Sequence, residues 1–175
     1  GVRGEGPEYE TLAGFGASLE INDLAAIARA NDLCNRLGLD TISTSGVAAF
    51  AFEAFENGLI SSEEIEGVSL AWGQPAGLLK LIALIAERHG AGDYLADGVR
   101  RAAEHLGHDA SEYAIHVKGL EMAYHDPRAT FSMAANYATA NRGACHLEAL
   151  SYWTIFGLDG TSWAPHPYER FSQAG

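Results

Sequence analysis

Apolar residues recur every three to four positions through most of this chain, and that spacing restricts its fold more than any other feature. The clearest case covers residues 24–37. Asn22 or Asp23 can cap its first turn, and Gly38 stands where a glycine commonly ends a helix. Alternating strand patterns are scarce. The sequence therefore predicts an all-α, multihelical fold whose helices are joined by short loops.

Further helices follow from the same period and from capping residues. Pro75 suits the first turn of one helix, and Asp126 followed by Pro127 can open another. Ser61 and Glu64 have the spacing of a capping box. Thr44 or Ser45 is expected to precede the second helix. The additional helices are predicted over residues 47–57, 75–90, 93–107 and 128–140.

The helical period stops between residues 108 and 125, which we interpret as an extended or loop segment. This change places a boundary near residue 112. Residues 1–112 are predicted to belong to one helical domain, and residues 113–175 to the incomplete start of the next. The chain lacks an initiator Met and ends in sequence typical of a domain interior, so we expect it to be a piece of a longer protein.

Charge argues against two classes of function. The chain has 11 Lys and Arg residues against 23 Asp and Glu residues, which gives a net charge of −12. Its few basic residues are scattered, so neither a nucleic-acid partner nor membrane-surface attachment is expected. No apolar run is long enough to predict a transmembrane helix. Only two cysteines occur, and no pattern suggests a disulfide framework, so a reducing cytoplasm is the expected location.

No short motif by itself identifies a catalytic or metal site. The sequence contains no H-E-x-x-H, C-x-x-C, G-x-S-x-G or P-loop pattern. His105 and His108 have a spacing that suits two metal ligands on one helix. They also lie at a predicted helix C-terminus, where the helix dipole favours cationic groups, and we favour this second interpretation.

Three segments carry more polar and glycine residues than a helical core requires. The first pairs two carboxylates with an aromatic ring. The second joins a glycine turn to several hydroxyl groups and could bind a polar ligand. The third places a lysine, two arginines and a histidine around glycine turns. These segments are residues 6–11, residues 35–44, and residues 118–128 taken with 141–146.

Together the segments resemble the helical part of the aldehyde ferredoxin oxidoreductase family, which contains tungsten and molybdenum enzymes with a bis-pterin cofactor. The resemblance extends over residues 4–150 and fades beyond Tyr152. Five stretches carry it, in the family's order and with similar spacing: GPEYETL (6–12), ANDLCNRLGLDTIST (30–44), HVKGLEM (116–122), YHDPR (124–128) and NRGACHLEA (141–149).

The resemblance implies an enzyme that oxidises a small aldehyde to a carboxylic acid. It implies electron transfer through a [4Fe–4S] cluster to ferredoxin or another acceptor, and it allows a homo-oligomer. The N-terminal β-rich domain, the cluster cysteines and the later C-terminal part of the family lie outside this chain. Those missing domains are the expected partners, and the segment alone is expected to be inactive and to bind no cofactor. Cys34 and Cys145 are not assigned to the cluster.

Site residues follow from the same motifs. Glu10 is expected near the metal as a proton acceptor, His146 as a hydrogen-bonding partner of the substrate oxygen, and Tyr124 near the substrate. The pterin dithiolenes hold the metal, so no protein ligand to it is predicted. The pterin-binding motif reads Asp-x-x-Gly-Leu-Asp or Cys in the family, and here its first Asp is replaced by Asn. Predicted cofactor-binding residues are Asn35, Gly38, Leu39 and Asp40, with Lys118 and Arg142 as cationic neighbours.

Two other functions stay open. A relative of benzoyl-coenzyme A reductase would act on aromatic acyl-coenzyme A thioesters instead of aldehydes. A helical binding module would keep the fold and lack the cofactor.

Overall fold

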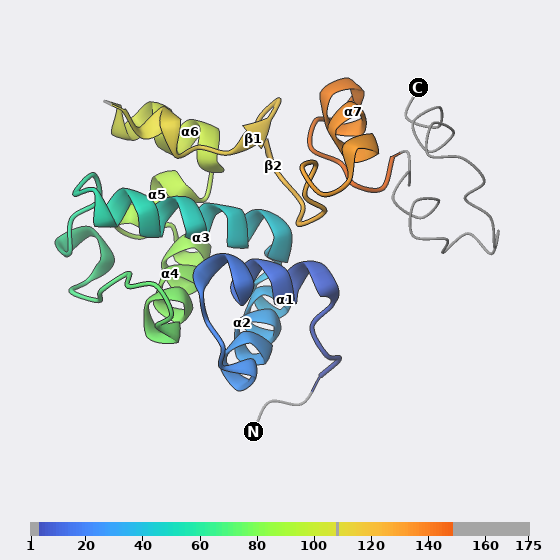
Figure 1. The fold of residues 1–175 in the computed structure, drawn as a ribbon. Helices are drawn as coiled ribbons and strands as arrows, with labels where there is room; N and C mark the ends of the chain where they lie inside the picture. Colours follow the sequence, from blue (N-terminus) through green and yellow to red (C-terminus); the bar gives the residue numbers. More distant parts are fainter. Residues whose placement is uncertain (1–3, 108, 149–175) are drawn as a thin grey trace. The chain divides into compact units, whose positions relative to one another are not determined.

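The computed structural model describes residues 4–107 and 109–148 (Figure 1). The chain divides into two compact units after Ile115, and each is described by itself. The boundary expected near residue 112 lies close to this division. That the units correspond to two domains of a family stays a prediction.

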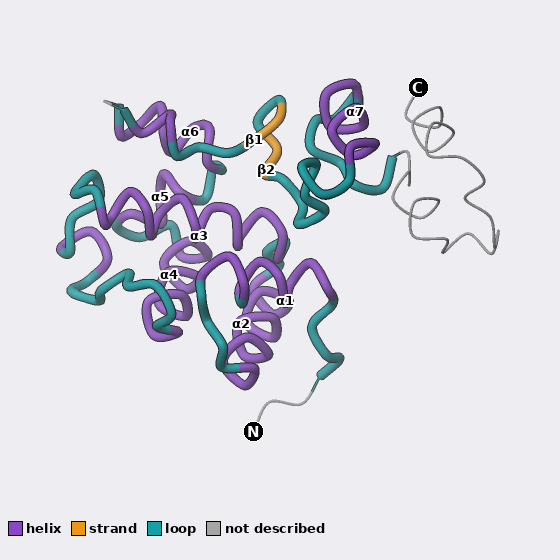
Figure 2. The backbone as a smooth tube through the Cα atoms, viewed as in Figure 1, coloured by secondary structure: helices purple, strands orange, loops and turns teal. Residues whose placement is uncertain are grey.

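The first unit consists of helices and short connections, which confirms the all-α prediction for this part of the chain (Figure 2). Helix α1 packs against α2 and α3, while α4 packs against α2, α3 and α5. Short 3₁₀ helices cover residues Ala17–Leu19, Glu63–Ile65 and Ala110–Glu112. The α-helices are α1 (Tyr9–Phe15), α2 (Leu24–Leu37), α3 (Thr41–Glu56), α4 (Pro75–Glu87), α5 (Ala91–Leu95) and α6 (Val99–Leu106).

Large side chains and small residues share the core of the first unit. Phe15, Phe50 and Phe52 are fully buried, together with several leucines and isoleucines. Gly92 lets α5 approach α4, because a Cβ at this position would lie 2.0 Å from the Leu84 carbonyl oxygen. No helix in the described ranges is both long and apolar enough to cross a membrane.

Helix α2 has the bounds that its sequence predicts. The Asp23 carboxylate accepts hydrogen bonds from the backbone N–H groups of Ala25 at 2.9 Å and Ala26 at 3.1 Å. At the other end, Gly38 has a φ of 71°, which glycine adopts without the steric cost of a side chain. The N-terminal cap and the C-terminal glycine are therefore both confirmed.

The predicted start of the next helix is wrong. Helix α3 begins at Thr41, before the expected start after Thr44 or Ser45. The reason is the cap at Asp40, whose carboxylate accepts a 2.7 Å hydrogen bond from the Ser43 N–H. The run TISTS contains several residues that are common caps, so local preference alone did not select the right one.

Two other predicted helices are shorter than expected. The helix over 93–107 is interrupted at Gly98, whose φ of 88° separates α5 from α6. The helix expected to open at Asp126 and Pro127 begins only at Phe131. There the Asp126 carbonyl accepts hydrogen bonds from Ala129 N–H at 3.1 Å and Thr130 N–H at 3.0 Å, which closes a separate turn.

The second unit contains a small hairpin and one helix. Strands β1 (His116–Val117) and β2 (Leu120–Glu121) pair antiparallel, with His116 opposite Glu121. This agrees with the extended segment expected before residue 125. Helix α7 (Phe131–Thr139) contributes Met133 and Tyr137 to a buried cluster with Ala144. Gly143 approaches the hairpin closely, since a Cβ there would lie 2.2 Å from the Val117 carbonyl oxygen.

A network of hydrogen bonds joins Ser61 and Glu64 of the first unit to Tyr94 of α5. The Glu64 carboxylate accepts hydrogen bonds from Ser61 N–H (2.9 Å), Ser61 Oγ (2.7 Å) and Tyr94 Oη (3.1 Å). Partial burial by itself raises the pKa of Glu64, but these hydrogen bonds and the nearby His105 outweigh it, so the pKa lies below its usual value of 4.5. The capping-box spacing of Ser61 and Glu64 is thus realised.

Replacing Tyr94 by Phe should lower the free energy of unfolding of the native protein at pH 7 by about 0.5–1.5 kcal/mol, because the Glu64 carboxylate loses one donor. A carboxyl whose folded pKa is depressed stabilises the fold above its unfolded pKa and loses that contribution as pH falls through the folded pKa. The difference should therefore shrink below about pH 4. Denaturant unfolding of both proteins at pH 7 and at pH 3 measures this difference in the free energy of unfolding.

Tyr113→Phe is the matched control, because no hydrogen bond involves this hydroxyl in the described residues and little change is expected. A Tyr94→Phe penalty that is equal at pH 7 and pH 3 would show that Glu64 is not the group involved.

Candidate functional site

The turn between α2 and α3 brings four predicted site residues into one short segment. Gly38 reverses the chain, and the Leu39 N–H donates a 2.9 Å hydrogen bond to the Cys34 carbonyl. Asp40 then caps α3. Asn35, Gly38 and Asp40 are exposed, and a Cβ at Gly38 would meet no atom within 4 Å. The backbone at this turn is therefore open to a ligand.

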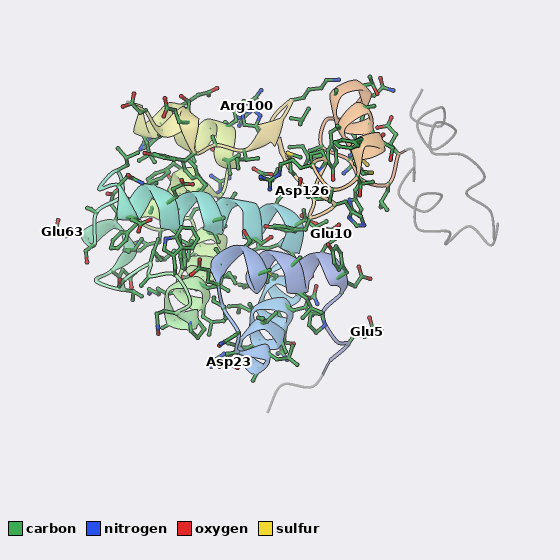
Figure 3. The ribbon with its side chains drawn as sticks, viewed as in Figure 1. Glu5, Glu10, Asp23, Glu63, Arg100 and Asp126 are labelled. Carbon is green, nitrogen blue, oxygen red and sulfur yellow. The ribbon has the colours of Figure 1, made fainter. Side chains whose placement is uncertain are left out.

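Helix α1 supports the same turn from one side. Thr11 and Thr41 share a 2.8 Å hydrogen bond between their Oγ1 atoms. Glu10, the residue before Thr11, is only 7% exposed. Figure 3 labels Glu10 in the first turn of α1. The predicted proton acceptor thus lies on a helix that is fixed against the start of α3.

A small pocket of about 150 Å³ lies beside α2. Its most telling residue is Asn31, which is only 8% exposed and makes no hydrogen bond through its side chain in the described residues. The Asp32 carboxylate also faces the pocket, and its Oδ2 accepts a 2.8 Å hydrogen bond from Arg36 Nε. The pocket is lined by residues 4–7, Ala28, Asn31, Asp32 and Asn35.

The thiol of Cys34 is buried, and its raised pKa keeps it protonated at neutral pH. Burial raises its pKa, a hydrogen bond with Thr44 lowers it, and the negative charge of Asp40 raises it again, to about 12. Metal binding and nucleophilic attack require the thiolate. Cys34 therefore acts as a small core residue under the turn.

In the second unit, His146 is half-buried and stacks on a neighbouring imidazole. The ring centroids of His125 and His146 are 5.1 Å apart, and their planes differ by 15°. Tyr124, the residue before His125, is also half-buried. Two loops that are far apart in sequence thus bring the imidazole rings of His125 and His146 together.

Helix α7 holds both of these loops by their backbone. Asn136 Nδ2 donates a 2.7 Å hydrogen bond to the Cys145 carbonyl, and Tyr137 Oη donates a 3.0 Å hydrogen bond to the His125 carbonyl. Asn136 and Tyr137 are both buried. The position of His146 is therefore set from inside the unit.

The two predicted cations differ in their surroundings. Lys118 Nζ donates a 2.7 Å hydrogen bond to the Ala140 carbonyl within the second unit, so its ammonium group already has a structural partner. Arg142 is exposed. Contact of either residue with pterin or phosphate stays a prediction.

Two residues of these candidate sites, Asn31 and His125, were not predicted from the sequence. Asn31 could have been found from its position one helical turn before Asn35, which puts both amides on one side of α2. His125 lies next to Tyr124, but its stacking on His146 depends on tertiary structure. Of the histidine pair considered for a metal, His105 stacks on Tyr94 with centroids 4.5 Å apart. His108 lies outside the described residues.

Comparison with known proteins gives consistent matches. A family model described as "Aldehyde ferredoxin oxidoreductase, domains 2 & 3" matches residues 1–174. The chain is 48% identical over 145 residues to a tungsten-containing aldehyde ferredoxin oxidoreductase of Pyrococcus furiosus, covering 82% of the chain and 24% of that protein. It is 45% identical to the protein of the same name from Thermococcus kodakarensis, also over 145 residues and with the same coverage.

Two more distant matches are proteins with other names. An aliphatic sulfonate oxidoreductase, WOR-like subunit, of Pyrococcus furiosus is 35% identical over 148 residues, covering 81% of the chain and 24% of that protein. A solved structure, the active site complex BamBC of benzoyl coenzyme A reductase with 1,5 dienoyl-CoA, matches with a TM-score of 0.67 and 23% identity. It covers 98% of this chain and 28% of that one, and it shows the fold alone. The chain spans about a quarter of the length of its curated relatives.

Asp40→Ala should lower the free energy of unfolding by about 0.5–2 kcal/mol, because α3 loses its N-terminal cap. Asp40→Asn is the matched control, since Asn caps about as well and removes only the charge. Denaturant unfolding of the native protein compares the two variants. Equal destabilisation by both would show that the charge of Asp40, and not its capping hydrogen bond, stabilises the turn.

Proposed function

This chain belongs to the aldehyde ferredoxin oxidoreductase family, and from that premise we propose that it serves a tungsten- or molybdenum-pterin enzyme that oxidises aldehydes to carboxylic acids. The supporting observation is its 48% identity, over 82% of the chain, to a relative whose name states both tungsten and the aldehyde reaction. Because that relative is about four times longer than the matched region, the activity is proposed for the whole protein.

The turn after α2 suits the pterin. Asn35, Gly38, Leu39 and Asp40 would hold it, with Asn35 offering both a donor and an acceptor in place of the family's carboxylate. The bound metal–pterin group supplies the two-electron redox chemistry, and an iron–sulfur cluster outside this chain passes the electrons on singly. The protein residues described here bind, orient and handle protons.

The pocket beside α2 supports this fit. Asn31 lines the pocket and makes no side-chain hydrogen bond in the described residues, so its amide is available to a polar ligand there. The ring edge of a pterin carries amino, N–H and carbonyl groups that match an amide and a carboxylate. Asp32 lies within one helical turn of Asn35 and supplies a negative charge near the position where the family's Asp is replaced by Asn. We therefore add Asn31 and Asp32 to the proposed cofactor-binding residues.

The proposed catalytic residues have separate tasks. Glu10 accepts a proton from water or from the hydrated aldehyde, and His146 donates a hydrogen bond to the substrate oxygen. Tyr124 contacts the substrate. The burial of Glu10 supports its role, because its carboxylate is held largely out of bulk water.

We propose ferredoxin as the electron acceptor, the cytoplasm as the location, and a homo-oligomer as the assembly that the family resemblance allows. Lys118 and Arg142 stay as secondary candidates for contact with the pterin or its phosphate. Neither nucleic acid nor a membrane is a proposed partner, for the reasons of charge and hydropathy given above.

Two alternatives have weaker support. Reduction of aromatic acyl-coenzyme A thioesters is favoured only by a likeness of fold at 23% identity. Action on an aliphatic sulfonate has support at 35% identity, below the values for the aldehyde enzymes. A cofactor-free helical module would have no ligand to account for the motif residues that this chain shares with the family.

The native protein, purified without oxygen, tests the proposed function. We expect tungsten or molybdenum together with iron by elemental analysis, and aldehyde-dependent reduction of ferredoxin with one acid formed per two electrons. Absence of all three metals would favour the binding module. Metal-loaded protein that turns over only aromatic thioesters or sulfonates would overturn the aldehyde assignment.

The pocket residues allow a second test, on pterin content. Asn31→Leu and Asp32→Asn should each lower the pterin and tungsten bound per native protein several-fold, because a polar contact is removed. Arg29→Ala is the matched control, because it removes an exposed cation of α2 that does not line the pocket. Pterin released by oxidation is measured by fluorescence. Full pterin content in both pocket variants would exclude their role.

A further inference from the structure

We propose that His125 is a positioning residue that fixes the imidazole plane of His146 for its hydrogen bond to the substrate. The inference rests on the role proposed above for His146. It goes beyond that role by assigning a function to a second histidine, whose ring lies against the first in the same unit.

The stack is close to parallel. With centroids 5.1 Å apart and planes that differ by 15°, the two rings lie nearly parallel in an offset stack. Face-to-face contact restricts rotation of the His146 ring about its Cβ–Cγ bond. The two ring nitrogens lie on the edge, so stacking orients them without using them.

The supporting ring is itself held in place. Tyr137 is only 3% exposed, and its hydroxyl donates to the carbonyl of His125 at 3.0 Å. Its neighbour Asn136 is 5% exposed and donates to the Cys145 carbonyl, one residue before His146. Two consecutive residues of α7 therefore fix the backbones of both stacked histidines, and the relative position of the rings is defined by a buried helix.

The loop around His125 is closed by further local contacts. The next residue, Asp126, accepts hydrogen bonds from the backbone N–H of Arg128 at 2.8 Å and from its guanidinium group. Its carbonyl accepts from Ala129 and Thr130. These contacts hold the 125–130 turn through Asp126, next to the stacked ring of His125.

A shift in ring orientation changes rate more than binding. A misplacement of about 1 Å can reduce a rate by about 100-fold. Loss of the supporting ring should therefore lower kcat, while the substrate KM and the cofactor content change little.

The experiment compares three variants of the native holoenzyme. His125→Ala removes the ring, and we expect kcat to fall about 10- to 100-fold. His125→Phe keeps a flat ring without nitrogens and should recover most of the rate. His146→Leu removes the hydrogen-bond donor proposed to contact the substrate. Tungsten and pterin content should be unchanged in all three, and kcat and KM are determined separately for an aldehyde.

Carbethoxylation of His146 by diethyl pyrocarbonate, followed by peptide mass spectrometry, gives a readout that does not depend on turnover. His125→Ala should increase the modification rate several-fold, and His125→Phe should not. This measurement reports the stack even where the aldehyde assay fails.

Unchanged kcat and unchanged modification in His125→Ala would overturn the proposal. Equal loss of rate in the Phe and Ala variants would also overturn it, because the nitrogens of His125 and not its plane would then be required. Full activity in His146→Leu would instead overturn the proposed role of His146. Activity lost in His146→Leu but kept in His125→Ala would remove only the positioning role.

Discussion

The hydrogen bond from the Ser43 N–H to the Asp40 carboxylate fixes where α3 begins, and the site turn in the first unit depends on it. Because Asp40 ends the turn that Gly38 starts, only Leu39 lies between the C-cap of α2 and the N-cap of α3. Both helices are anchored in the core, through Cys34 on one and Phe50 on the other. The exposed turn is therefore a rigid edge on a packed scaffold.

The second unit reaches a similar result by a different route. Its loops contain little regular structure, and the buried polar side chains of α7 hold them by their carbonyl groups. A buried hydrogen bond to a backbone carbonyl specifies a loop position more sharply than apolar packing does, because it has a preferred distance and direction. In both units, residues near a candidate site position take part in the architecture that supports it.

Local rules predicted the fold class, the bounds of α2 and the start of α4, because caps and glycines act within a few residues. They misplaced the start of α3, where several hydroxyl residues compete as caps, and they missed the break at Gly98, which a continuous apolar period conceals. Motif resemblance supplied the candidate residues Asn35, Glu10 and His146. The burial of Asn31 and the stack of His125 on His146 depend on contacts that sequence spacing does not encode.

Gly143 shows how little variation the loop before His146 can accept. Gly143 lies three residues before His146 and has a φ of 103°, a backbone conformation that other residues rarely adopt. The Val117 carbonyl oxygen occupies the place where a Cβ would be, so a side chain has no space there. Any substitution of Gly143 replaces a hydrogen of its Cα by a Cβ, at a point that the Val117 carbonyl oxygen already occupies. Tolerance to mutation around the site is therefore expected to be narrowest at a residue that has no functional group.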